Sequence, residues 1–535
     1  PIEQERGVTI KLAPVTMNYQ LDARRYTLNL IDTPGHVDFA YEVDRSLAAC
    51  EGAILLIDGT RGIQAQTLSV AHKAVNLGLH LIPAINKIDL SSAHVPDCLK
   101  QLHDVFGFKP EEISLVSAKT GQGVSELLAR VITDIPAPQG APTSTLRALI
   151  FNSTYDEHLG VIAFVRIVDG SLKSKLALTT LQTHQTINPK EIGIFIPSRQ
   201  STPSLSHGQV GYIATGLKSI QDLKVGDTLS TSPTTPLPGY QAPQPVVFVN
   251  AYPAEDTDYR QLVDAVTKLK LSDASLTVKP VHSAALGPGL RLGCLGLFHI
   301  DITRERLERE HHLHLILTPP TVDYHIDPAT GAAQEPWVKI TLITPPEFIG
   351  PLMHLFTDHR GTYTTTTYFG NQAQLTYHLP LAELISGLVD QVKSASQGYA
   401  SFDYEPLDYQ PVDIVKLDIL VHHQPVDALS RLVVRSQAVP LARRLVAKLK
   451  DILPPQQFAV PIQAAIGPAN GGAAGHIIAR ATKPALRKDV TAKLYGGDQT
   501  RKDKLLKKQK KGKKLLAQTA SVHVPGHVLT QLATI

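Results

Sequence analysis

A short polar motif near the N-terminus has the residue types that phosphate chemistry needs. It reads Asp32-Thr33-Pro34-Gly35-His36 and follows the apolar run Leu28-Asn-Leu-Ile31. A carboxylate at the carboxyl end of a buried parallel strand lies at the ligand crevice of an open α/β sheet. There it can hold the water shell of a Mg²⁺ ion on nucleotide phosphates. Gly35 provides backbone that can approach a γ-phosphate closely, and the His36 imidazole can orient an attacking water. By itself, the motif is as typical of a turn that ends a strand as it is of a phosphate site.

Two further motifs carry polar groups that can recognise guanine. An apolar run at 81–85 leads into Asn86-Lys87-Ile88-Asp89, and a second run at 114–116 leads into Ser117-Ala118-Lys119. The Asp89 carboxylate can accept the N1 and N2 hydrogens of guanine, which adenine lacks, while the aliphatic stem of Lys87 covers the ring. The backbone of the last motif can contact the purine O6. Because three such motifs in this order rarely coincide, together they predict a guanine nucleotide site.

The apolar runs predict the elements that position these motifs. Residues 28–31, 53–57 and 81–85 are short and apolar, with helix-compatible spacing between them. Such runs are typical of strands in a parallel sheet that is buried on both faces and connected by helices. A Pro-rich linker at 136–142 closes this unit, so residues 1–136 are predicted to form an α/β domain.

The remaining residues predict four more domains, so the fold class is multidomain, with α/β and α+β units. Residues 145–232 contain short β-rich runs, which predict a small antiparallel β-barrel. Residues 245–325 and 335–412 share a β-α-β-β-α-β rhythm, which predicts two ferredoxin-like domains. Residues 413–535 are predicted to form a mixed, basic C-terminal domain.

Positive charge is concentrated in one part of the chain. The formal net charge is +4, yet residues 476–514 hold 14 Lys and Arg against three Asp. A protein with one strongly basic region is typically a polyanion binder, and phosphate contact needs no aromatic platform. The candidate RNA-binding residues are Arg501, Lys502, Lys504, Lys507, Lys508, Lys510, Lys511, Lys513 and Lys514. A solvated charge run and a membrane-surface role remain the alternatives.

Cysteine usage and hydropathy exclude several classes of protein. Cys50, Cys98 and Cys294 are far apart and have no CxxC spacing, which argues against a disulfide framework or a zinc site and fits a reducing compartment. The sequence contains no apolar run of the length that a transmembrane helix needs. An i,i+4 charge pattern in 299–310 is interpreted as a solvated helix face without chemistry.

The three polar motifs resemble the G3, G4 and G5 elements of translational GTPases. The stretch Arg6-Gly-Val-Thr9-Ile10 resembles their switch I element. The resemblance implies that GTP or GDP is bound with Mg²⁺, that Thr9 and Asp32 form the metal environment, and that Gly35 and His36 act at the γ-phosphate. The implied guanine-binding residues are Asn86, Lys87, Ile88, Asp89, Ser117, Ala118 and Lys119.

Downstream sequence resembles elongation factor 4 (LepA) in particular. The segments that resemble this family are Leu292–His299, Ser396–Tyr404, Val460–Gly467 and Tyr495-Gly-Gly-Asp498 with the basic run after it. The resemblance implies a GTPase that engages the ribosome and tRNA and acts on the translocation state or on small-subunit assembly. It also implies a monomer in the cytoplasm, with the inner face of the cell membrane or an organelle as further sites.

Two departures from the family pattern lead to specific expectations. The 535 residues contain no G-x-x-x-x-G-K-[ST] phosphate loop, whose amides and Lys hold nucleotide phosphates. We therefore expect residues 1–136 to form a partial GTPase domain that lacks the family's phosphate loop and first strand, and the chain to bind GTP poorly as it stands. Segment 468–475 is expected to be a surface loop. A GTPase-dead RNA-binding fragment and another translational GTPase, such as elongation factor G, are the alternative interpretations.

Overall fold

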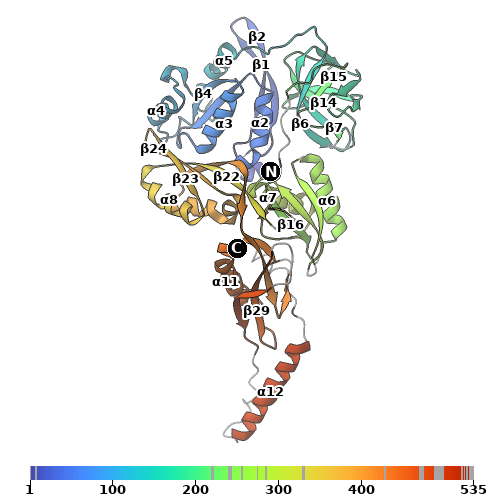
Figure 1. Ribbon diagram of the computed structural model, residues 1–535. Helices are drawn as coiled ribbons and strands as arrows, with labels where there is room; N and C mark the ends of the chain where they lie inside the picture. Colours follow the sequence, from blue (N-terminus) through green and yellow to red (C-terminus); the bar gives the residue numbers. More distant parts are fainter. Residues whose placement is uncertain are drawn as a thin grey trace.

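The computed structural model describes residues 2–519, except 7–8, 219–221, 239–243, 255–256, 274, 284–285, 328–329, 331, 427–428, 469–474 and 487–498, and also residues 522, 524–525 and 528. Two domains lie side by side at one end of the molecule, and two α+β domains lie beneath them (Figure 1). The C-terminal domain continues to helix α12 at the far end, so the molecule is elongated.

The first domain contains a parallel sheet with helices between its strands. β3 (Gly52–Asp58), β4 (His80–Asn86) and β5 (Ser114–Leu115) pair in that order. α1 (Ile2–Arg6), η1 (Val37–Phe39) and α2 (Ala40–Ala48) precede β3, and α3 (Ala65–Asn76), α4 (Val95–Phe106) and α5 (Val124–Asp134) follow the three strands in turn. The sheet register pairs Asp58 with Asn86, which places the ends of β3 and β4 side by side.

The prediction that residues 28–31 belong to this parallel sheet is wrong. They lie in β2 (Arg24–Asp32), which pairs antiparallel with β1 (Ala13–Leu21) in a separate two-stranded sheet. Leu28 still packs on the apolar cluster around Ile82 and Val116. The apolar run therefore indicates that these residues are covered, but it does not show that they hydrogen-bond to the parallel sheet. Among the described strands, only β4 pairs with β3, and Leu56 on β3 is 54% exposed.

The described strands of the second domain all pair antiparallel. Its eight-stranded sheet has the order β10-β9-β15-β6-β7-β14-β11-β12, and β8 pairs with β13 separately. The strands are β6 (Arg147–Asp156), β7 (Gly160–Asp169), β8 (Ser171–Lys173), β9 (Leu178–Thr180), β10 (Thr186–Ile187), β11 (Glu191–Ile196), β12 (Ser198–Ser201), β13 (Ser204–Ser206), β14 (Val210–Ala214) and β15 (Thr228–Ser230).

Two α+β units with the same element order follow. The first is β16 (Val247–Pro253), α6 (Tyr259–Ser272), β17 (Thr277–Ser283), β18 (Gly287–Cys294), α7 (Leu297–His311) and β19 (Leu315–Leu317). The second is β22 (Ala333–Thr344), α8 (Ile349–Asp358), β23 (Thr362–Phe369), β24 (Gln372–Pro380), a broken helix over Leu381–Ala395 and β25 (Ser401–Val412). Their buried side chains form one continuous apolar core.

The C-terminal domain packs one long helix on an antiparallel sheet. It comprises β26 (Ile414–Val421), β27 (Gln424–Pro425), β28 (Arg431–Val434), α11 (Arg435–Ile452), β29 (Val460–Pro468) and β30 (His476–Lys483), with α12 (Gln499–Thr519) beyond the sheet. Among the described residues, no helix has the length and apolar content to cross a bilayer.

A buried ionic network joins the fourth domain to the fifth. Arg360 donates to Glu335 at 2.6 Å and to Glu383 at 2.6 Å, and the two Glu side chains are only 2% and 3% exposed. Gln437 on α11 also donates to Glu383, at 2.7 Å. Because buried carboxylates need both charge and hydrogen-bond partners, this network ties α11 to the preceding domain.

Candidate functional site

The predicted guanine-binding residues lie together at the ends of β4 and β5. The Asn86 Oδ1 atom accepts the backbone N–H of Ala118 at 3.0 Å and that of Lys87 at 2.8 Å. The buried Ser117 hydroxyl donates to the Asp89 carboxylate at 2.7 Å. Since β4 and β5 are parallel neighbours, the loops that follow them meet at one edge of the sheet. Asp89 remains exposed and can accept further hydrogen bonds.

Lys87 has an unusual backbone conformation, and an ion pair holds its side chain in place. Its φ is 65°, in the left-handed region that non-glycine residues seldom adopt. Its ammonium group pairs with Asp58 at the end of β3, with 2.8 Å between Nζ and Oδ2. Asp58 also accepts from Thr60, and these hydrogen bonds and the Lys87 charge outweigh its desolvation, so its pKa lies below the usual range. Ile88 is half-buried against the helix α3 and α4 side of the domain, while Ala118 and Lys119 are exposed.

The two residues implied for the Mg²⁺ environment are also brought together. The Thr9 hydroxyl donates to the Asp32 carboxylate at 3.3 Å, in an exposed position at the end of β2. Hydroxyl and carboxylate oxygens suit Mg²⁺, which is usually held by one or two protein groups together with substrate phosphates. Within the described residues, no cluster of three His, Cys, Asp or Glu forms a complete metal site. Gly7 and Val8 of the same motif lie outside the described residues.

His36 points into a cavity between domains. Its ring packs against that of Phe298 from the third domain in a tilted arrangement, with 4.6 Å between ring centroids and an angle of 33° between the planes. The His36 Nδ1 atom accepts the backbone N–H of Asp38 at 3.2 Å, which leaves the proton of the neutral ring on Nε2. Burial is the main reason that the pKa of His36 is lowered, although the Asp38 carboxylate opposes this effect. The imidazole is therefore favoured in its neutral form.

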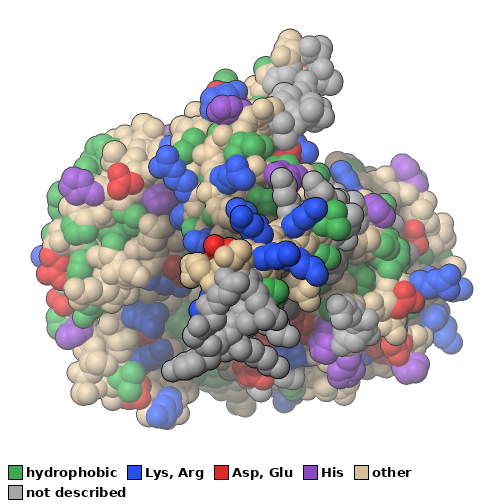
Figure 2. Space-filling model, turned by 90° about the horizontal axis from the view of Figure 1, so that it is seen from below, with side chains coloured by type: hydrophobic (Ala, Val, Ile, Leu, Met, Phe, Trp, Pro, Cys, Tyr) green, Lys and Arg blue, Asp and Glu red, His purple; other side chains and the backbone are tan. Residues whose placement is uncertain are grey.

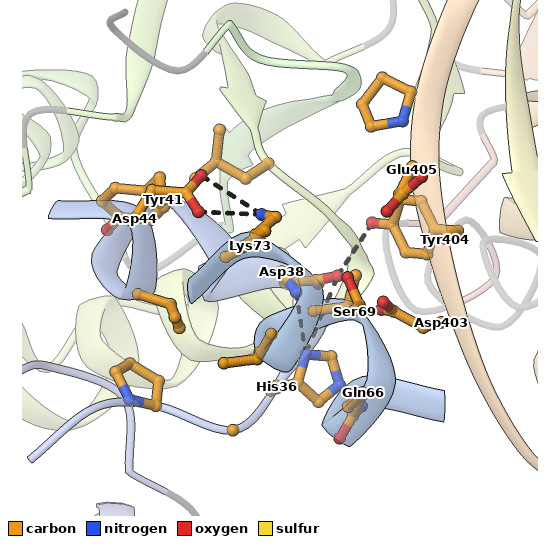
Figure 3. Close-up of a pocket in the computed structure, with 18 of the residues that line it drawn as sticks. His36, Asp38, Tyr41, Asp44, Gln66, Ser69, Lys73, Asp403, Tyr404 and Glu405 are labelled. Atoms are coloured by element: carbon orange, nitrogen blue, oxygen red, sulfur yellow. Dashed lines mark hydrogen bonds and ion pairs between the residues drawn. The ribbon is translucent and has the colours of Figure 1, made fainter. Parts of the chain in front are cut away.

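The cavity beside His36 has a volume of about 250 Å³ and is lined by three domains. Thr33 precedes the cavity, whereas Pro34 and Gly35 line it, and a Cβ atom built on Gly35 would meet no atom within 4 Å. Figure 3 shows His36, Asp38 and Lys73 from the first domain facing Asp403, Tyr404 and Glu405 on β25. Burial raises the pKa of Asp403 to about 6 despite a hydrogen bond from Ser69.

Sequence reasoning missed the residues that connect the first domain to the third and fourth. Asp38 accepts from the backbone N–H of Phe298 at 2.8 Å and from the Tyr404 hydroxyl at 3.0 Å. Glu305 is only 7% exposed and accepts from Arg6 at 3.1 Å, so the interpretation of 299–310 as a solvated face is wrong for this residue. The acidic residue two positions after His36 was the only sequence signal for these contacts, because their partners are hundreds of residues away.

The basic residues lie mainly on one exposed helix. Within the described side chains of α12, Lys504, Lys507, Lys508, Lys510 and Lys511 are exposed, and Lys502 and Lys513 are half-buried. Lys513 donates to the Leu486 carbonyl at 2.6 Å, and no ion pair joins these described lysines to a carboxylate. Viewed from this end of the molecule, Lys and Arg gather around the centre (Figure 2). The side chains of Arg501 and Lys514 lie outside the described residues, as do segments 469–474 and 495–498.

The sequence motifs thus form three separate groups in this structure. One group gathers Asn86, Lys87, Asp89, Ser117 and Ala118, a second joins Thr9 to Asp32, and the third places His36 in the interdomain cavity. Among the described residues, no hydrogen bond connects the guanine-binding group to Asp32. The convergence of all three groups on one nucleotide therefore stays a prediction.

Family models match three parts of the chain. Residues 1–137 match the elongation factor Tu GTP binding domain, residues 332–420 match the elongation factor G C-terminus, and residues 421–534 match the GTP-binding protein LepA C-terminus. The combination is that of a multidomain translational GTPase. A solved structure of a protein from Thermus thermophilus is similar in fold, with a TM-score of 0.58 and 16% identity over 77% of this chain and 90% of that one.

Curated relatives match the chain over almost all of its length. Proteins named elongation factor 4 from Bifidobacterium animalis subsp. lactis, Bifidobacterium longum subsp. infantis and Bifidobacterium longum are each 45% identical to it. Each match covers 98% of this chain and 86% of the relative. A translation factor of this kind interacts with the ribosome. The chain belongs to the elongation factor 4 family of translational GTPases.

Proposed function

We propose that this protein hydrolyses GTP on the ribosome and that Asn86, Lys87, Asp89, Ser117 and Ala118 select guanine. The observation that carries this proposal is the pair of hydrogen bonds that join Asn86 to Ala118 and Asp89 to Ser117. These bonds orient the exposed Asp89 carboxylate to accept two hydrogens from the Watson–Crick edge of guanine. Ile88 and Lys119 complete the two loops.

The same proposal assigns the phosphate end of the nucleotide to the other two groups. Thr9 and Asp32 would hold Mg²⁺, which neutralises charge on the phosphates when it is bound. Thr33, Pro34 and Gly35 would approach the γ-phosphate. His36 would orient the attacking water by donating from Nε2, in keeping with its neutral form. In the present structure His36 faces Phe298, so this role requires the loop to move toward the nucleotide.

We further propose that α12 binds tRNA or ribosomal RNA through backbone phosphates. Its exposed lysines, with no carboxylate partner among the described residues, support this role, because phosphate contacts need charge and reach but no base readout. The biological outcome would be a change in the translocation state of tRNA or a step in small-subunit assembly. Family membership also favours a monomer in the cytoplasm, and sedimentation with anionic vesicles would test the alternative of contact with the membrane.

The second candidate function is an RNA-binding chain without GTPase activity. The specific observation is that no phosphate-loop motif occurs in the 535 residues, although the amides and Lys of that loop supply most phosphate contacts in such enzymes. We expect the 535-residue chain to bind GDP weakly. Saturable micromolar binding of GDP by this chain would overturn that expectation.

The experiment for guanine selection exchanges Asp89 for Asn in a chain extended with a phosphate-loop segment. An amide at this position can donate to the O2 of xanthine, but it offers the two guanine hydrogens one uncharged oxygen in place of the two carboxylate oxygens. The Asp89→Asn chain should therefore lose about 10- to 100-fold in GTP affinity, since charged hydrogen bonds contribute about 1.5–3 kcal/mol, and should gain affinity for xanthosine triphosphate. Asp97→Asn, on the neighbouring helix α4, is the matched control. Unchanged preference for GTP would refute the role of Asp89.

A further inference from the structure

Asp38 is a buried carboxylate for which neither nucleotide binding nor metal binding gives a role. It is 5% exposed and lies in the first domain, but most of its hydrogen-bond partners come from elsewhere. Its Oδ2 atom accepts the backbone N–H groups of Phe298 at 2.8 Å and His299 at 3.3 Å, in the first turn of α7. Its Oδ1 atom accepts the Tyr404 hydroxyl of β25 at 3.0 Å.

These contacts explain how a carboxylate is tolerated in this position. A buried charge is costly unless hydrogen bonds and charge compensate for it. Two free amides at the start of α7 provide hydrogen bonds and the positive end of the helix dipole. Burial and the Asp38 carboxylate raise the pKa of Tyr404 well above its usual range, so its hydroxyl stays a donor. Among the described residues, no Lys or Arg pairs with Asp38.

The backbone before α7 lies so close to the Asp38 side chain that only glycine fits there. Gly296 precedes α7, and a Cβ atom at this position would lie 2.2 Å from the carboxylate carbon of Asp38. The φ of Gly296 is −172°, an extended conformation that any residue adopts, so the requirement for glycine comes from contact and not from backbone strain. A side chain at Gly296 would push the carboxylate away from the amides.

The same contacts hold the loop that carries His36. The backbone N–H of Asp38 donates to His36, and the Phe298 ring packs on the imidazole. Phe298 therefore contacts both residues, through its amide and through its ring. A movement of His36 toward a nucleotide must separate it from Phe298, and a displacement of α7 or β25 must pull on Asp38.

Helix α7 also contacts the segment that precedes Thr9. Glu305 accepts from Arg6, and Arg309 pairs with both Glu305, at 2.5 Å, and Glu5, at 2.8 Å. One helix of the third domain thus contacts both segments that lead to the proposed phosphate site. This second contact is made by exposed or half-exposed cations, whereas the contact with Asp38 is buried.

We propose that Asp38 is a positioning residue that couples the His36 loop to α7 and β25. While its carboxylate holds the α7 amides and Tyr404, His36 stays against Phe298, away from the nucleotide. A rearrangement of the downstream domains on the ribosome breaks these hydrogen bonds and frees the loop for catalysis. This coupling rests on the proposed role of His36, but the contacts themselves are present without nucleotide.

Hydrogen exchange on the 535-residue chain, without nucleotide or ribosome, tests the coupling. Tyr404→Phe removes one hydroxyl in the fourth domain and should speed amide exchange in the peptide that covers residues 34–39. Asp38→Asn and Gly296→Ala should also speed exchange at Phe298 and His299, by about tenfold or more, because hydrogen bonds to a charged group are lost. Tyr399→Phe, on an exposed tyrosine nearby, is the matched control and should match the wild type.

Two outcomes would overturn the inference. One is that Tyr404→Phe leaves exchange in the 34–39 peptide unchanged. The other is that Gly296→Ala leaves exchange at the start of α7 unchanged. Tyr404→Phe and Gly296→Ala are small changes, so they keep the test decisive if Asp38→Asn fails to fold.

A kinetic measurement separates positioning from a merely structural effect. In a chain extended with a phosphate loop, Tyr404→Phe should change kcat of ribosome-stimulated GTP hydrolysis several-fold and leave KM for GTP unchanged. A parallel change in both, or in neither, would contradict coupling to the His36 loop. If the extended chain without substitutions fails to hydrolyse GTP, the proposed function fails, whereas the exchange results stand on their own.

Discussion

Replacing Asp403 by Asn tests the electrostatics of the interface between the first and fourth domains. Asp403 lies on β25, is 5% exposed, and lines the cavity beside His36. Burial is the main cause that raises its pKa from 3.8 to about 6. The carboxylate therefore becomes charged in a site that disfavours charge. An Asn side chain has the same shape and can still accept from Ser69, but it cannot ionise.

The magnitude follows from this difference in pKa. Each pKa unit corresponds to about 1.4 kcal/mol, so ionisation of Asp403 costs the folded protein about 2–3 kcal/mol at pH 7.5. Because the folded pKa is raised, the stabilising contribution of the protonated form is fully present below the unfolded value of about 4 and is lost as the pH rises through 6. Asp403→Asn should thus stabilise the chain by about 2 kcal/mol at pH 7.5 and by only about 1 kcal/mol at pH 4.5.

Thermal unfolding at these two pH values measures the effect. We expect Asp403→Asn to raise Tm by several degrees at pH 7.5, on a scale of about 2–4 °C per kcal/mol for domains of 150–250 residues. The gain should shrink at pH 4.5. Asp408→Asn, at an exposed position on the same strand, should have little effect at either pH. An equal gain at both pH values, or a loss at pH 7.5, would refute the assignment of a costly buried charge to Asp403.

Three further predictions follow from the same structure. In a chain extended with a phosphate loop, His36→Ala should leave GTP affinity within about twofold and reduce ribosome-stimulated hydrolysis by about 100-fold or more, and an equal loss of binding would make His36 structural. Arg360→Met should reduce stability by about 3–5 kcal/mol, since it leaves the buried Glu335 carboxylate without a cation and Glu383 with only His359, whereas Arg304→Met on exposed helix surface should cost under about 1 kcal/mol. Four Lys→Gln substitutions on α12 should flatten the salt dependence of RNA binding by a slope of about 3, with Lys→Arg as control, and an unaltered slope would return the helix to the role of a solvated surface. The four positions are Lys507, Lys508, Lys510 and Lys511.

Local motifs were the part of the site that could be predicted from sequence. Asn86, Asp89 and Ser117 were identified because they lie at or shortly after the end of an apolar run, and parallel strands place their carboxyl ends at one edge of a sheet. The structure connects these residues by hydrogen bonds. Family membership was also recognisable, because motifs peculiar to elongation factor 4 occur along the C-terminal half.

Pairing between strands could not be predicted in the same way. Residues 28–31 were assigned to the parallel sheet because they are apolar, yet β2 pairs only with β1 among the described strands. Apolar character reports that a strand is covered, and Leu28 is indeed packed against the sheet's apolar cluster. Apolar character does not indicate which strand is the hydrogen-bond partner, because every residue except proline has the same backbone donor and acceptor.

By itself, the sequence determined which chemical groups this protein has for its chemistry. The carboxylate, amide and imidazole groups belong to short contiguous motifs, which can be recognised without knowledge of the tertiary structure. The tertiary structure alone decided where those groups face. It turned His36 toward Phe298, buried Asp38 against amides some 260 residues away, and placed Glu305 beside Arg6. Contacts of such range depend on how whole domains pack, and packing of this kind leaves no periodic pattern in the residues that make it.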